Sequence, residues 1–197
     1  MQPHFMTGPP LARALLQYFR ELESRLQLTR PITAYLAGGM AVHLYIGVRV
    51  TTGIDAEFGS RIAPPADLII QAPTPDDPDR FIYLDTNYNP MFSLLHEDYQ
   101  ADALPLDIDT KNLRLRILSP LDLAVSKVAR FQATDQEDIA GLVEAGLVKA
   151  DALEKRAEQA LSAFIGNIDM IRYNLRDALE LARGIERGEK GSKPQIS

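Results

Sequence analysis

The stretch ITAYLAGGMAVHLYIGVRVTTGIDAEF, residues 32–58, decides the expected fold. It begins with a β-branched and aromatic run, Ile32–Leu36, which predicts a short strand. Gly38 and Gly39 follow as a turn, and the apolar residues 40–46 predict a short helix that Gly47 stops. The stretch therefore predicts a strand, a glycine turn and a helix, followed by a second strand over residues 54–58.

The flanking sequence supplies one long helix and more strands. Apolar residues recur at helical spacing over residues 11–26, and Pro31 ends that pattern. Further strand-like runs, separated by Pro, Gly, Asp and Asn, cover residues 67–71, 80–85 and 113–118. Together these runs predict a small mixed sheet with helices beside it.

The pattern changes to helices after residue 118. Ser119 is suited to an N-cap with Pro120 in the first helical position, and Thr134 with Glu137 predicts a capping box for a helix through Val143. Two more helices are expected, over residues 150–165 and along an apolar stripe over residues 168–182. The predicted fold class is α+β with a C-terminal helical bundle, divided into a core at 1–118, a helical part at 119–186 and a flexible tail at 187–197.

Composition narrows the function classes. The chain has 197 residues, a net charge of -6, no Cys and 3 His, so disulfides, thiolate metal sites and cysteine nucleophiles are excluded. The acidic balance argues against coating of nucleic acid, so any such contact is expected to be a local patch. No apolar run approaches the roughly 18 residues of a membrane span, and a cytoplasmic protein is expected.

Gly38 and Gly39 are the first candidates for chemistry. Residues without a Cβ let the backbone N–H groups at a helix N-terminus approach a phosphate closely. The alternative is a tight turn that only needs positive φ, which is the commoner role of an isolated glycine pair.

Asp55 and Glu57 are the second candidates. They are two residues apart on the predicted strand, so their side chains should share one face while Ala56 and Phe58 face the core. Paired carboxylates suit Mg²⁺, which prefers oxygen ligands and neutralises triphosphate charge. The alternative is the solvated face of an edge strand.

Together these residues resemble the nucleotidyltransferase superfamily that includes DNA polymerase β, whose motif is a Gly-Gly or Gly-Ser turn followed by Asp-x-Asp on the next strand. The order GG, short helix, R-x-T-x-D-x-D is similar to the AbiEii-type branch of toxin–antitoxin systems. Residues that match in order and spacing are Gly38, Gly39, Arg49, Thr51 and Asp55. Gly53 stands where that branch has its first metal Asp, and Glu57 is the expected replacement ligand.

A second block, residues 118–139, is similar to the later half of that branch, in which a helix carries a Lys and the next helix begins with D-x-x-D. Lys127, Asp135 and Asp138 match. The resemblance implies that Lys127 binds nucleotide phosphate and that Asp138 orients or activates an attacking hydroxyl. The alternatives are a surface lysine, and acidic residues that stabilise a helix dipole by about 0.3 to 1 kcal/mol.

Residues 85–99 concentrate aromatic and polar side chains between the two blocks. Asp85 is a reserve metal ligand and His96 could approach a substrate, although a turn and a core-facing histidine are the favoured interpretations.

The resemblance implies a Mg²⁺-dependent nucleotidyltransferase that binds a nucleoside triphosphate and uses a tRNA or protein hydroxyl as acceptor, as a bacterial toxin–antitoxin component with a cognate partner. Asp55, Lys127 and Asp138 are the expected catalytic residues, Asp55 and Glu57 the metal ligands, and the nucleotide-binding set is Gly38, Gly39, Thr51, Thr52 and Lys127. Because of Gly53, a second interpretation stays open, in which the protein is a non-catalytic binding module or an antitoxin. In a third interpretation Gly53 is a cloning variant that abolished toxicity, and Gly53→Asp would then slow growth of the host.

Overall fold

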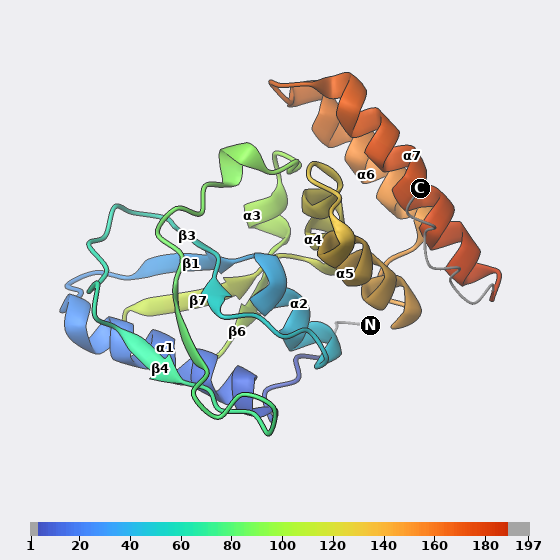
Figure 1. Cartoon of the computed structure of the whole chain (residues 1–197). Helices are drawn as coiled ribbons and strands as arrows, with labels where there is room; N and C mark the ends of the chain where they lie inside the picture. Colours follow the sequence, from blue (N-terminus) through green and yellow to red (C-terminus); the bar gives the residue numbers. More distant parts are fainter. Residues whose placement is uncertain (1–3, 189–197) are drawn as a thin grey trace. The chain divides into compact units, whose positions relative to one another are not determined.

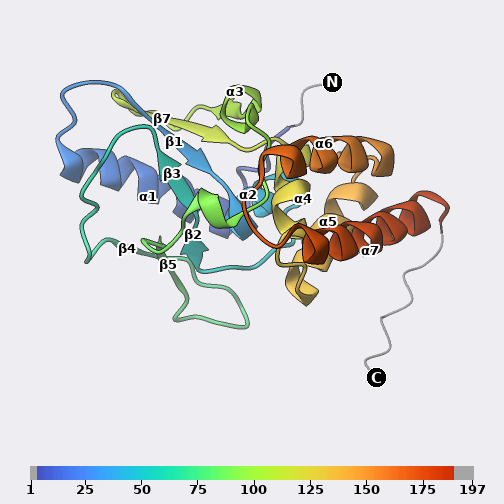
Figure 2. The same ribbon diagram turned by 90° about the horizontal axis from the view of Figure 1, so that it is seen from above.

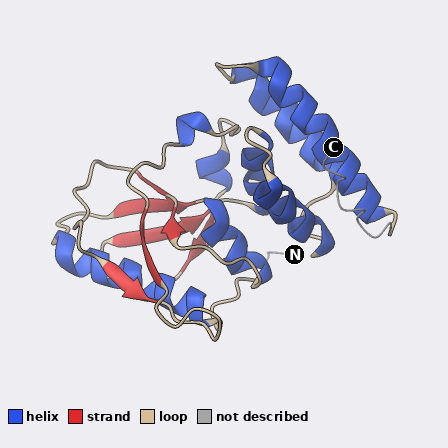
Figure 3. Ribbon diagram, in the orientation of Figure 1, coloured by secondary structure: helices blue, strands red, loops and turns tan. Residues whose placement is uncertain are grey.

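The computed structural model describes residues 4–188, in two compact units that are considered separately (Figure 1). One unit comprises Met1–Pro90 and Asp98–Ser119, and the other comprises Met91–Glu97 and Pro120–Ser197. Strands lie only in the first unit, as far as the chain is described (Figure 3). The mixed α+β class is confirmed. Most of the predicted tail, from residue 189 on, lies outside the described residues.

A four-stranded sheet forms the centre of the first unit. Its order is β3 (Ala56–Phe58), β1 (Ile32–Leu36), β7 (Leu113–Ile117) and β6 (Leu104–Leu106). The strands β1 and β7 run parallel, whereas β3 and β6 pair antiparallel at the two edges. The same unit contains the helices α1 (Pro10–Leu26) and α2 (Gly38–Ile46). The predicted strand and helix are confirmed, and the glycine pair forms the first turn of α2 where a separate turn before the helix was expected.

Residue alternation gives this sheet two different faces. Ile32, Ala34 and Leu36 are buried, and so are their β7 neighbours in register, Leu113, Leu115 and Ile117. The intervening Thr33 and Tyr35 of β1 are partly accessible, as are Arg114 and Arg116 of β7. One face therefore belongs to the core, and the other carries polar side chains.

The strand predicted over residues 54–58 is wrong as a single element, because it divides at Asp55. β2 (Gly53–Ile54) joins a second sheet of order β2-β5-β4, with β5 at Phe81–Leu84 and β4 at Ile69–Gln71. On one side of the division Ile54 O accepts from Asp85 N–H, and on the other β3 pairs with β1. The backbone changes partner sheet at this residue, which the alternation of side chains does not reveal.

Three elements between β5 and β7 were not predicted: the 3₁₀ helix η1 (Pro90–Phe92), the short helix α3 (Tyr99–Asp102) and β6. Pro105 lies within β6, and proline breaks a strand pattern because it cannot donate to a ladder. It is tolerated here because β6 is an edge strand.

The second unit contains the helices α4 (Pro120–Val128), α5 (Ala133–Glu144), α6 (Ala150–Ala163) and α7 (Ile168–Glu186), seen from above in Figure 2. The helix α4 packs on each of the other three, and α7 also packs on α5 and α6. The predicted helical bundle is confirmed. Within residues 4–188, no helix combines the length and apolarity that a membrane crossing would require.

The capping box of α5 differs from the prediction. Gln132 is the N-cap and Asp135 is the third helical residue, and each side chain accepts from the backbone of the other. The predicted pair, Thr134 and Glu137, is wrong because both residues lie inside the helix. A glutamine is an uncommon N-cap, so the sequence pattern favoured the threonine.

Candidate functional site

Gly38 and Asp55 lie against each other in the site. Gly38 opens α2 with φ 63°, a conformation that favours glycine. A Cβ at this position would overlap Asp55 Oδ2 and would lie 2.7 Å from Asp55 Cγ. Only a glycine therefore lets this carboxylate lie against the first turn of α2.

Hydrogen bonding fixes Asp55 beside the glycine turn. Its carbonyl oxygen accepts from Ala37 N–H at 2.8 Å, which ties the residue to the end of β1. Ala37 is the N-cap of α2 and offers no side-chain acceptor. The Asp55 carboxylate thus supplies negative charge at the positive end of the helix dipole, which stabilises the fold whether or not the residue is catalytic.

The other residues of the first motif gather at the same turn. A Cβ at Gly39 would lie 3.2 Å from Arg49 Nε and 3.4 Å from Thr51 Cβ, so Arg49 and Thr51 cover this glycine. The predicted neighbour Thr52 is exposed, and its carbonyl oxygen accepts from Tyr83 N–H at 3.1 Å. The structure therefore brings together Gly38, Gly39, Arg49, Thr51 and Asp55, while Thr52 contributes its backbone to the second sheet.

Glu57 lies on β3 and accepts a hydrogen bond from the Tyr99 hydroxyl of α3. Burial, followed by the hydrogen bond to Glu57, raises the pKa of Tyr99 well above its usual range, so the hydroxyl stays a donor at neutral pH. Burial also raises the pKa of Tyr88, to which the negative charge of Asp55 and, more weakly, of Glu57 adds. Both carboxylates therefore lie near one phenol, although Asp55 is outside any strand.

The concentration of aromatic and polar residues over 85–99 included Tyr88 and Tyr99, but no pattern gave either residue a role, and none marked His43. His43, on α2, is 4% exposed and its Nδ1 donates to Arg49 O at 2.6 Å. Burial lowers the pKa of His43, so the ring is neutral at pH 7. This bond joins α2 to the segment that leads to Asp55. A histidine within an apolar helix is usually interpreted as a core residue. His43 is buried as that interpretation expects, and it also bonds the segment that leads to Asp55.

Gly53 has room for a side chain. A Cβ there would lie 3.8 Å from Asp85 Cβ, an ordinary contact distance. Asp85 follows β5, and its Oδ1 accepts from Asn87 N–H at 2.9 Å in a tight turn. The reserve carboxylate Asp85 thus stands beside the position where the resembling branch has its first Asp. His96 is half-buried in the other unit.

In the helical unit, Lys127 lies between two carboxylates. Its Nζ is 2.8 Å from Asp138 Oδ2 and 3.4 Å from Asp135 Oδ1, and each of the three residues is at most 7% exposed. Arg130 makes two further bonds to Asp135, at 2.7 and 2.8 Å. Although burial acts to raise it, Arg130, Lys127 and the Gln132 N–H together hold the pKa of Asp135 below its usual value. The predicted pair Lys127 and Asp138 is therefore brought together as a buried ion pair.

The donor set at the glycine turn suits Mg²⁺ in its chemistry. Asp55 and Glu57 offer carboxylate oxygens, and Mg²⁺ is commonly held by one or two carboxylates together with substrate phosphates and waters. Across residues 4–188, no three His, Asp or Glu side chains are grouped closely enough to hold a metal by themselves. The residues therefore fit an ion that arrives with a nucleotide, and do not form a metal cage.

Ala56 and Phe58, which alternate with Glu57 along β3, line a pocket of about 280 Å³. Tyr88, Leu84 and Ile62 add apolar and aromatic surface, and Asp85, Ser60 and Arg61 add polar groups. Apolar walls with few polar groups are typical of small-molecule pockets.

Comparisons with known proteins identify one family. No curated protein and no solved structure matches the chain significantly. A family model described as nucleotidyltransferase of unknown function (DUF6036) matches residues 13–181, which span the glycine turn, Asp55, Glu57 and the Lys127 cluster. The chain therefore belongs to this family of nucleotidyltransferases.

Proposed function

We propose that this nucleotidyltransferase uses Mg²⁺ to transfer a nucleotidyl group from a nucleoside triphosphate to a hydroxyl group of RNA, such as tRNA, or of a protein. The observation that carries the proposal is the contact between Gly38 and Asp55. It combines a helix N-terminus that begins with two glycines, which suits a phosphate, with a carboxylate that suits the cation accompanying it.

In the proposed reaction the acceptor hydroxyl oxygen bonds to the α-phosphorus, the bond from that phosphorus to the bridging oxygen breaks, and pyrophosphate leaves. The hydroxyl proton passes to a carboxylate base. The α2 N-terminus at Gly38 and Gly39 would bind phosphate oxygens, and Thr51 and Thr52 are the other residues proposed to contact the nucleotide. Lys127 offsets triphosphate charge, and Asp138 orients the acceptor hydroxyl or accepts its proton.

Asp55 and Glu57 would hold Mg²⁺, which when bound neutralises negative charge on the triphosphate. The Tyr99 hydroxyl is the positioning group for Glu57, because it fixes one carboxylate oxygen and leaves the other oxygen for the metal. The pocket lined by Phe58 and Tyr88 is suited to the nucleoside, since aromatic side chains stack on bases.

The spacing from Gly38 to Asp55 supports membership in the AbiEii-type branch. In that setting the protein would act as a growth-inhibiting bacterial toxin in the cytoplasm, controlled by a cognate antitoxin. Expression of the chain alone in a bacterial host, compared with the Asp55→Ala variant, tests this role: the unaltered chain should slow growth and the variant should not.

Transfer of radiolabel from each α-labelled nucleoside triphosphate to total tRNA or to host protein, with Mg²⁺ present, tests the activity. We expect label to appear, and Asp55→Ala to abolish it. Asp76→Ala, which removes an exposed carboxylate of the same unit, is the matched control and should keep full activity. Transfer by Asp55→Ala at the unaltered rate would contradict the assignment.

A catalytically degraded binding module or antitoxin is the second candidate. One observation favours it: Gly53 occupies the position of the first motif Asp, and the described residues hold no three-carboxylate group. This candidate predicts triphosphate binding, or partner binding, without transfer of label under any condition in which the protein is folded.

A further inference from the structure

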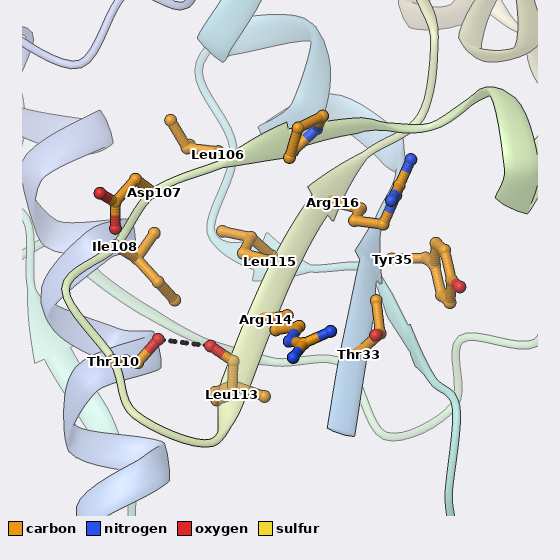
Figure 4. A pocket seen from close by; sticks show the side chains of 11 residues that line it. Thr33, Tyr35, Leu106, Asp107, Ile108, Thr110, Leu113, Arg114, Leu115 and Arg116 are labelled. Atoms are coloured by element: carbon orange, nitrogen blue, oxygen red, sulfur yellow. Dashed lines mark hydrogen bonds between the residues drawn. The ribbon is translucent and has the colours of Figure 1, made fainter. Parts of the chain in front are cut away.

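A hollow of about 320 Å³ lies on the polar face of the four-stranded sheet (Figure 4). Thr33 and Tyr35 reach into it from β1, and Arg114 and Arg116 from the neighbouring β7. These residues form two rows across the strands, since Thr33 pairs with Arg114 and Tyr35 with Arg116 in the register.

The hollow continues the row that contains Glu57. Glu57 of β3 is opposite Tyr35, which is opposite Arg116, so the three side chains cross three neighbouring strands on one face. Adjacent strands are about 4.8 Å apart, which places the Arg116 backbone roughly 10 Å from that of Glu57. A molecule bound in the hollow would therefore reach the carboxylate proposed to hold the metal.

The two arginines differ in how they are held. Arg116 Nε donates to Ala103 O at 3.0 Å, and its Nη2 donates to the same carbonyl, so backbone acceptors fix its guanidinium. The Arg114 side chain is exposed, and it makes neither a hydrogen bond nor an ion pair with any residue in the described range. One carboxylate, that of Asp107, also lines the hollow, and its Oδ1 accepts from Asp109 N–H at 3.0 Å. The hollow thus carries two cations against one anion in a protein of net charge -6.

We propose that this hollow binds the acceptor, and that the acceptor is a single-stranded nucleic acid. The guanidinium group of arginine can donate two hydrogen bonds to the oxygens of one phosphate. Arginines two residues apart on a strand are about 6.6 Å apart, which is comparable to the distance between successive phosphates of an extended nucleic acid strand. Tyr35, between Glu57 and Arg116, offers an aromatic face on which a base stacks. This inference rests on the proposed function, since it names the acceptor of the same site.

Fluorescence anisotropy of a short labelled single-stranded RNA with the full chain tests the proposal. Arg114→Gln should weaken binding roughly tenfold, as expected for loss of one charge-assisted hydrogen bond, and Arg114→Lys should restore part of it. Each lost phosphate contact should also reduce the slope of log affinity against log salt by about 0.7. Arg176→Gln is the matched control, because it removes the same charge from an exposed position on α7.

Equal binding by the Arg114→Gln and Arg176→Gln variants, or no binding by the unaltered chain, would overturn the proposal. Displacement of the RNA by an acidic peptide at equal charge concentration would overturn it in favour of a protein acceptor.

Two controls separate this result from unfolding and from loss of the donor site. Because Arg114 is exposed, the thermal unfolding midpoint of Arg114→Gln should equal that of the unaltered chain. Titration of Arg114→Gln with a triphosphate and Mg²⁺ should match the unaltered chain. Loss of triphosphate binding in both proteins would refute the donor site, and it would leave the RNA result to stand by itself.

Discussion

The two regions that carry the motif residues surround their carboxylates with different neighbours. In the first unit, Asp55 lies against a glycine backbone and Glu57 accepts from a neutral phenol. In the helical unit, Asp135 and Asp138 face Lys127 and Arg130, and Asp122 is bound by Arg156 at 2.8 and 3.1 Å. A carboxylate that accepts from a neutral hydroxyl, as Glu57 does, keeps its negative charge available to a cation, whereas carboxylates paired with buried cationic side chains are already balanced. The comparison indicates that the ion pairs of Lys127 contribute to the stability of the helical unit, in addition to the roles proposed for Lys127 and Asp138 in the transfer reaction.

Lys127→Met should have the largest effect on stability. It leaves Asp138 buried without its ammonium, and breaking a buried ion pair costs about 3 to 5 kcal/mol. Urea unfolding measures this change. Lys155→Met on the exposed face of α6 is the control and should change stability by less than about 0.5 kcal/mol. An equally small effect at Lys127 would show that its ion pairs do not support the bundle.

Gly38→Ala should come next, because it combines backbone strain with overlap of the Asp55 carboxylate. Gly146 is a matched control: it also has positive φ, 70°, but no atom lies within 4 Å of its would-be Cβ. Gly146→Ala should cost about 1 kcal/mol from strain alone, and Gly38→Ala about 1 to 2 kcal/mol more. Equal costs in thermal unfolding would mean that Asp55 moves away freely.

The lowered pKa of Asp135 predicts a pH dependence in the helical unit. The carboxylate is favoured in the folded state, so its contribution is fully present above the unfolded value of about 3.8 and is lost as the pH falls through the lower folded value. Asp135→Asn should flatten the stability profile in that acidic window. Urea midpoints measured between neutral pH and pH 3 would reveal this, and parallel profiles for the two proteins would contradict it.

Gly53→Asp should have the smallest effect on folding, within about 0.5 kcal/mol, since the position has no positive φ and a Cβ fits beside Asp85. It adds a carboxylate two residues before the proposed metal ligand Asp55, so it should tighten Mg²⁺ binding in calorimetry. Slower growth of the host on its expression would further indicate that the native chain is attenuated at this residue. Unchanged Mg²⁺ affinity would show that position 53 lies outside the metal site.

The sequence predicted those features that depend on neighbouring residues. The run Ile32–Leu36, the glycine pair and Gly47 act locally, and their strand and helix were found as expected. The division at Asp55 was missed because it depends on which distant strand each residue meets, β1 or β5. The α5 cap was misplaced because Asp135 is bound by Arg130 and Lys127, contacts that a capping pattern does not contain. Tyr99 was missed because its link to Glu57 spans 42 residues.

Calorimetric titration of the full chain with nucleoside triphosphates in the presence of Mg²⁺ tests the central claim most directly, with Gly38→Ala and Gly146→Ala titrated alongside. The account predicts that at least one triphosphate binds the unaltered chain and the Gly146→Ala variant alike, and that Gly38→Ala binds none. Binding that survives Gly38→Ala undiminished, or no binding by the folded unaltered chain, would contradict a phosphate site at the glycine turn.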